Sequence, residues 1–121
     1  MADFISETMT SGFIYNPHYR TQCITLNAQA DPLPRGSIIC VKSTADGTFD
    51  LIGASSGDYG THYGVLLNDV PASASTQAAD VVVAGELFYS YVNAVFAAAN
   101  SGTDLAATDL VALRNIGIIL K

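Results

Sequence analysis

Four side chains in the sequence, two histidines and two cysteines, are strong ligands for a soft metal ion. They are His18, Cys23, Cys40 and His62, separated by 5, 17 and 22 positions. Structural zinc sites draw their ligands as close pairs, with about two to four residues between cysteines and about three to five between histidines. Because neither close pair occurs, the spacing predicts no metal site. We expect two packed, reduced thiols and two surface imidazoles.

The sequence also lacks the patterns of an enzyme. There is no G-x-S-x-G motif and no cysteine in an electropositive setting that would lower its pKa. The phosphate-binding loops G-x-x-x-x-G-K-[ST] and G-x-G-x-x-G do not occur either. Residues 43–50 hold two aspartates, but an EF-hand loop needs more carboxylates and a terminal glutamate. We therefore nominate no catalytic residue, no metal, no cofactor and no small-molecule substrate.

Alternating apolar residues from Thr21 onward predict strands. In residues 22–27, Ile24 and Leu26 face one side of a strand while Cys23 faces the other. Residues 71–79 read as a linker rich in alanine and serine. Further strands are expected over 37–43, 63–70 and 80–92, with a hairpin at Asp46-Gly47 and a kink or bulge at Gly85.

The C-terminal third predicts short helices. Residues 93–99 are rich in alanine, and Thr103 is a suitable N-cap for a helix over about 104–115. Asp104 would then lie in the first turn, where its charge suits the helix dipole. The apolar residues after Gly117 predict a last strand or a buried tail. The expected fold class is mostly β, with one or two short helices in the C-terminal third.

The first twenty residues differ from the rest of the chain. Residues 1–20 show no sustained period, yet they contain several large apolar side chains, which solvated disordered tails usually lack. We interpret residues 1–20 as an extended arm that becomes ordered against a partner, and residues 21–121 as a single β-rich domain. The alternative is that residues 1–20 add a strand to that domain.

Charge is scarce and unevenly distributed. Charged residues make up 13% of the chain, against about 25% in typical soluble domains. The surface is therefore either partly covered by partner subunits or composed of uncharged serine, threonine, alanine and asparagine. Residues 1–42 are balanced, whereas residues 43–121 hold eight acids and two cations. So acidic a body repels phosphate backbones, and we expect no nucleic-acid partner.

Membrane and secretion signals are missing from the pattern. No apolar run approaches the ~20 residues of a membrane span. The first residues have neither the basic region nor the apolar region of a secretory signal. We expect synthesis in a cytoplasm and no membrane partner.

Short motifs follow one another along residues 13–121 in a fixed order. The residues concerned are Leu33, Arg35, Gly36, Ile38 and Ile39, then Gly47 and Phe49, then Gly64, Val65 and Leu66, then Val83, Ala84, Gly85 and Glu86, and finally Gly117 and Ile118. This order resembles the lambda-type bacteriophage head decoration proteins, the capsid-stabilising protein D family. The departures from that family are an unusually aromatic arm and a final Lys121.

The resemblance implies a β-clip-like fold and a structural role. Such proteins assemble as homotrimers on the exterior of the expanded icosahedral phage head, where they clamp neighbouring major capsid proteins. The expected partners are thus the major capsid protein and the chain itself, and the expected location is the virion, after synthesis in the host cytoplasm. The arm residues expected to bind the capsid are Phe13, Ile14, Tyr15, Asn16, Pro17, Tyr19 and Arg20.

Two other classes of function compete with this interpretation. One is another structural phage protein, such as a tail or baseplate component or a trimeric adhesin. The other is a small β-barrel that binds a ligand or acts as an enzyme, which a polar pocket with convergent ionisable groups would support.

Overall fold

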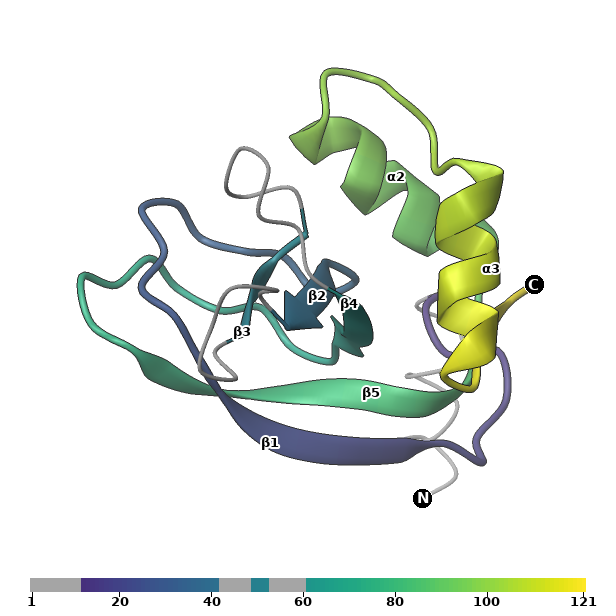
Figure 1. The fold of residues 1–121 in the computed structure, drawn as a ribbon, viewed down its shortest axis with the longest axis horizontal. Helices are drawn as coiled ribbons and strands as arrows, with labels where there is room; N and C mark the ends of the chain where they lie inside the picture. The colour runs from purple at the N-terminus through teal and green to yellow at the C-terminus, as the bar shows by residue number, and fades with distance from the viewer. Residues whose placement is uncertain (1–11, 42–48, 53–60) are drawn as a thin grey trace.

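The computed structural model describes residues 12–41, 49–52 and 61–121. Five strands close into a mixed barrel in the order β1-β3-β2-β4-β5, with β5 pairing back onto β1 (Figure 1). The mostly β class with two short helices near the C-terminus is thereby confirmed. The elements are β1 Arg20–Leu26, β2 Ile38–Val41, β3 Phe49–Leu51, β4 Thr61–Leu66, β5 Gln77–Leu87, α2 Tyr89–Ala99, α3 Ala107–Asn115 and β6 Ile118–Leu120.

The long antiparallel pair of β1 and β5 forms one wall of the barrel (Figure 1). Ile24 and Leu26 point into the barrel and are buried, as the alternation predicts. Cys23 lies on the opposite face and is exposed, while Cys40 in β2 is buried. The prediction of two packed thiols is therefore wrong for Cys23, because a barrel wall has one face toward the core and one toward solvent.

Strand β5 changes partners at Gly85, where the sequence predicts a kink or bulge. Its first part pairs with β1 and β4, and its last three residues pair with β6 in parallel. The register against β1 shifts between Arg20 and Thr21, and Gly85 has a φ of +144°. A Cβ atom at Gly85 would lie 2.6 Å from the Cβ of Tyr19, so only glycine fits there.

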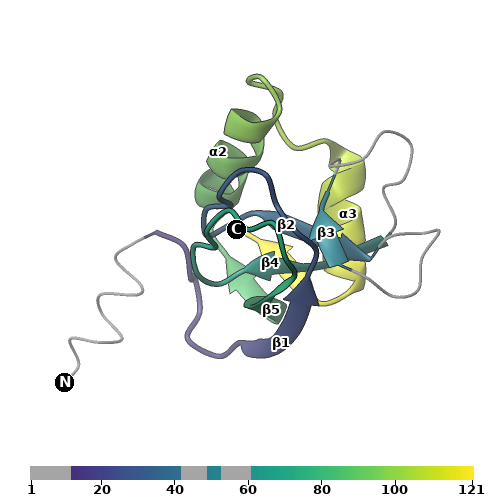
Figure 2. The same ribbon diagram turned by 90° about the vertical axis from the view of Figure 1, so that its left-hand side faces the viewer.

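Both helices differ from their predicted limits. Helix α2 begins at Tyr89, whereas the sequence predicts a strand over 80–92. Tyrosine and valine favour strands in general, but here Val92 is fully buried on a helix. Helix α3 begins at Ala107, and Thr103 does not cap it. Instead the carboxylate of Asp109 accepts the Ala106 N–H at 3.2 Å. α2 lies on the far side of the barrel from β1 (Figure 1, Figure 2).

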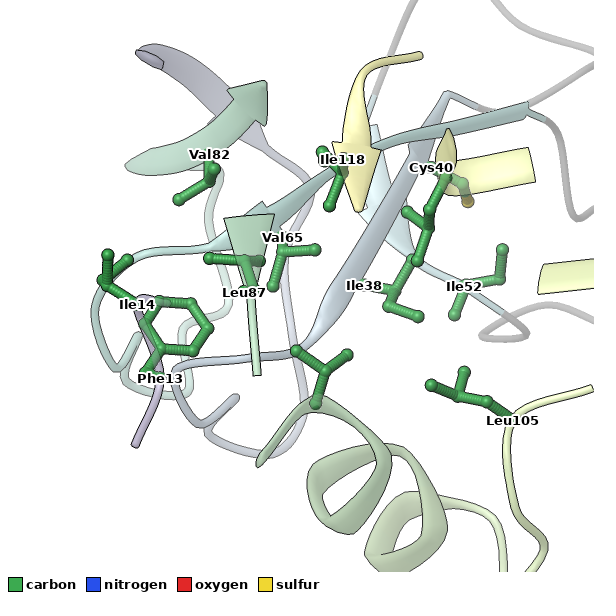
Figure 3. Close-up of a cluster of buried hydrophobic side chains, with 12 residues drawn as sticks. Phe13, Ile14, Ile38, Cys40, Ile52, Val65, Val82, Leu87, Leu105 and Ile118 are labelled. Carbon is green, nitrogen blue, oxygen red and sulfur yellow. The ribbon is translucent and has the colours of Figure 1, made fainter. Parts of the chain in front are cut away.

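Two clusters of buried side chains fill the molecule. The first cluster joins the N-terminal segment, the strands and both helices (Figure 3), and the second lies between β1, β4 and β5. Phe13 and Ile14 belong to the first cluster, and both have no exposed surface. The predicted boundary between an arm and a domain at residue 20 is therefore wrong for residues 13 and 14, because two large apolar side chains are better buried in the chain's own core.

Several predictions fall on residues that the structure does not describe. They are the hairpin at Asp46-Gly47 and the interpretation of residues 1–11. Within the described part of the chain, no helix is long and apolar enough to cross a membrane.

Candidate interaction surface

The four strong metal ligands of the sequence lie in different parts of the fold. His18 and Cys23 are exposed, before and within β1, whereas Cys40 is buried in β2. His62, in β4, contacts Asp109. Across residues 12–41, 49–52 and 61–121, no three histidine, cysteine, aspartate or glutamate side chains gather in a way that could hold a metal ion.

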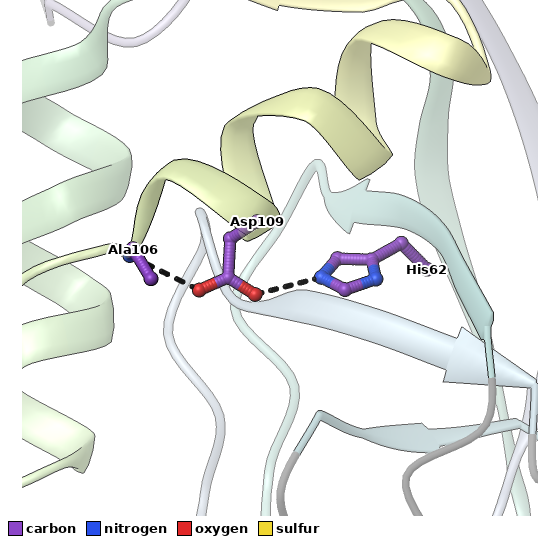
Figure 4. Close-up of polar contacts among 3 residues, drawn as sticks. All are labelled: His62, Ala106 and Asp109. Carbon is purple, nitrogen blue, oxygen red and sulfur yellow. Dashed lines mark hydrogen bonds and ion pairs between the residues drawn. The ribbon is translucent and has the colours of Figure 1, made fainter.

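The fold does bring a histidine and an aspartate into contact, beside a cysteine on the neighbouring strand, which the sequence alone does not reveal. Cys40 and His62 are partners across β2 and β4, and His62 Nε2 lies 3.0 Å from Asp109 Oδ1 (Figure 4). A nucleophilic thiol must be accessible to its substrate, but Cys40 is only 1% exposed. With Asp109 also accepting the Ala106 N–H, the arrangement ties the start of α3 to β4.

Residues 12–15, which we call the N-terminal root, are inserted beside the end of β5. The Tyr15 N–H donates to the Glu86 carbonyl at 3.0 Å, and the Phe88 N–H donates to the Phe13 carbonyl at 2.9 Å. These two bonds place Ile14 opposite residue 87 as an antiparallel bridge. Because the Phe13 and Ile14 side chains are buried, they anchor the chain to its own core and cannot insert into pockets of a partner.

Arg35 fastens the root to α2. Its guanidinium carbon lies 5.1 Å from the Phe13 ring centroid and 5.0 Å from that of Tyr91, and the two rings are 5.0 Å apart. Its Nε donates to the Tyr91 hydroxyl at 3.1 Å, while its backbone N–H donates to Asp69 at 2.7 Å. The neighbouring Gly36 has a φ of +97°, and a Cβ there would approach the Tyr91 ring to 3.0 Å. The turn containing Arg35 therefore holds residue 13 and α2 in a fixed relation.

Next to the root, four side chains form a surface that we call the terminal patch: Tyr15, Glu86, Phe88 and Lys121. The Tyr15 ring packs edge-to-face on Phe88 with centroids 5.1 Å apart. Lys121 Nζ lies 5.3 Å from the Tyr15 ring centroid and 3.8 Å from Glu86 Oε2. The Lys121 N–H also donates to the carbonyl of residue 87 at 2.8 Å. The patch thus joins the start and the end of the described chain.

The remaining predicted arm residues lie between the root and β1. Asn16 is half-buried and accepts the His18 N–H at 2.9 Å, which closes a local turn. Pro17 and Arg20 are exposed, and Tyr19 packs against the first core cluster. Of the seven predicted contact residues, the fold therefore leaves Tyr15, Pro17 and Arg20 most available to a partner.

The structure also has an open groove outside this surface. It is lined by the segments 32–34 and 69–71 and has a volume of about 450 Å³. Five of its six lining residues are proline, leucine or valine, and the sixth, Asp69, uses a carboxylate oxygen to accept the Arg35 N–H. The groove lacks the convergent ionisable groups that mark a catalytic pocket.

The site residues that sequence reasoning missed are Phe88, Tyr91 and Lys121. Tyr91 and Phe88 were assigned to a strand, and Lys121 was noted only as a departure from the family pattern. For the root itself the sequence does contain a signal. Phe13 and Ile14 are two adjacent large apolar residues, which are typical of a buried segment. Comparisons with protein-family models, with curated proteins and with solved structures found no match for this chain.

Proposed function

We propose that the chain is a non-enzymatic structural protein of a bacteriophage head. It binds the outer surface of the expanded capsid as a homotrimer and stabilises the shell by clamping neighbouring major capsid proteins. The N-terminal segment and the surface around its root provide the attachment.

The observation that carries this proposal is the anchored root. Residues 1–11 join the body at Gly12, directly before two side chains with no exposed surface. A partner that binds the chain before Gly12 is therefore connected to the core through Phe13 and Ile14. Binding that bridges shell subunits stabilises the assembled state by mass action and needs no chemistry.

The motifs behind the resemblance support the same surface. Arg35 stacks on Phe13, and Gly36 packs on α2. Glu86 accepts the backbone bond of Tyr15, and Ile118 pairs with Gly85 on the other side of β5. Arg35 and Glu86, which are far apart in the sequence, thus both contact the root.

The experiment is reconstitution on shells of the virus that encodes the chain. Empty expanded heads lacking the protein are mixed with the purified chain, sedimented and imaged by electron microscopy. We expect stoichiometric binding with density at three-fold positions, and a trimer in sedimentation velocity or on the shell. A chain that stays monomeric at micromolar concentration and does not sediment with the heads would overturn the proposal.

A further inference from the structure

The terminal patch is distinctive because it exposes an aromatic ring that is already held in place. Among the described residues, only Tyr15 and Val111 are large hydrophobic side chains that remain exposed, at 42% and 55%. Val111 lies alone on the outer side of α3. Tyr15 is fixed by a backbone hydrogen bond to Glu86, by the Phe88 ring and by Lys121. A preorganised ring loses little conformational entropy when a partner covers it.

Lys121 gives the patch a positive charge in a body whose acids outnumber its cations. The described part of the chain has seven acids and four cations, and one of these cations, Arg35, is engaged between two rings. Lys121 has 43% of its side chain exposed and approaches Glu86 only to 3.8 Å. Exposed ion pairs contribute about 0–1 kcal/mol, so this pair is easily exchanged for another.

Arg20 places a second positive charge beside β5. It pairs with Ala84 on one side of β5, while Lys121 follows the residue that pairs with Leu87 on the other side. Two exposed cations therefore lie on opposite sides of the end of β5, and Lys121 is the one that contacts Tyr15. An acidic surface is repelled by most of this protein and attracted here, which determines the orientation of docking as well as its strength.

From this juxtaposition we infer that the terminal patch is a docking site for a carboxylate-bearing segment of the capsid protein. Tyr15 and Phe88 contact apolar atoms of that segment, and Lys121 exchanges Glu86 for a carboxylate of the partner. The inference rests on the proposed function. Gly12 begins the root that carries Tyr15, so a shell subunit that binds the chain before Gly12 is tethered to the patch at high effective concentration.

The test measures binding to the same empty expanded heads at low and at physiological salt. Lys121→Met keeps most of the stem and removes the charge, and we expect it to weaken binding about tenfold at low salt. Tyr15→Ala should weaken binding about tenfold at both salt concentrations, since ring burial is not screened. Glu86→Gln removes the competing carboxylate and should strengthen binding about threefold at low salt, a change of sign that loss of structure cannot produce.

Two matched variants serve as controls. Arg114→Met removes another exposed cation, and Val111→Ala truncates the other exposed large hydrophobic residue; both should bind within twofold of the wild type. If all three patch variants also bind within twofold while a chain starting at Gly12 binds weakly, the patch inference is wrong and the proposed function stands. If the wild-type chain does not bind heads, both fail together.

Discussion

The side chain of Arg35 contacts Tyr91 twice, with its guanidinium carbon 5.0 Å from the ring centroid and its Nε 3.1 Å from the hydroxyl oxygen. This relationship holds the turn before β2 against α2. Tyr91→Phe keeps the ring and removes the hydroxyl, so it should lower the free energy of unfolding by about 1 kcal/mol. Arg35→Ala should cost about 2–3 kcal/mol, because the stacking on Phe13 and the packing of the stem are lost too. Urea denaturation measures both values, and equal costs for the two variants would contradict the stacking.

Two truncations should separate attachment from stability. A chain starting at Gly12 keeps Phe13 and Ile14, so we expect its thermal midpoint to remain near that of the full chain. A chain starting at Thr21 loses both side chains, and each costs about 2–5 kcal/mol when truncated in a core. Since domains of this size are stable by about 5–15 kcal/mol, this chain should be close to unfolded at 25 °C. Calorimetry decides: equal midpoints would show that the root contributes nothing to the core.

Phe13→Ala tests the contribution of the root to stability without removing any backbone. We expect Phe13→Ala to lower the free energy of unfolding by about 3–5 kcal/mol, whereas Tyr15→Ala should stay within about 1 kcal/mol of the wild type. Of these two side chains, Phe13 is fully buried and Tyr15 is exposed. Chemical denaturation of the two variants side by side measures the difference.

Gly85 and Gly102 form a matched pair for testing whether the packing of Tyr19 against the backbone requires glycine. Both have positive φ, but a Cβ at Gly85 would meet the Tyr19 Cβ at 2.6 Å, whereas a Cβ at Gly102 would meet nothing within 4 Å. Gly102→Ala should therefore cost only the backbone strain, about 1–2 kcal/mol. Gly85→Ala should add overpacking of about 1–3 kcal/mol. Equal losses in urea would mean that the contact with Tyr19 relaxes freely.

The two thiols should differ in reactivity. Cys23 is exposed on the outer face of β1, and Cys40 is buried in β2. In the native protein one thiol should react with an aromatic disulfide reagent within minutes. The second should react only after denaturation, because its exposure requires the barrel to open. Mass spectrometry of the labelled peptides identifies the reactive position, and rapid labelling of both would contradict the packing of β2.

Local patterns in the sequence predicted the barrel strands better than the helices or the root. The inward face of β1 follows from the alternation at Ile24 and Leu26, and the break in β5 follows from Gly85. The start of α2 was missed because tyrosine and valine favour strands in general, whereas the segment from Tyr89 is a helix that buries Val92.

The contacts of the root and of the terminal patch were beyond sequence reasoning because they are made with residues distant in the chain. Phe13 packs against Arg35 and Tyr91 as part of the first core cluster, and Lys121 reaches Tyr15 because β6 pairs with the end of β5. Residues 13 and 91 are far apart in the chain, and no period or spacing connects them.

The division of β5 at Gly85 has a mechanical consequence. Its last three residues are bonded on one side to the root and on the other to β6, while its first part is bonded to β1 and β4. A pull on the segment before Gly12 therefore passes through the bridge at Ile14 into β5, and from there into strands on both sides of the barrel. The force is therefore distributed over the hydrogen bonds of several strand pairs and does not act on one pair alone. In the proposed role of holding a shell together against internal pressure, this distribution of force would matter more than a high melting temperature.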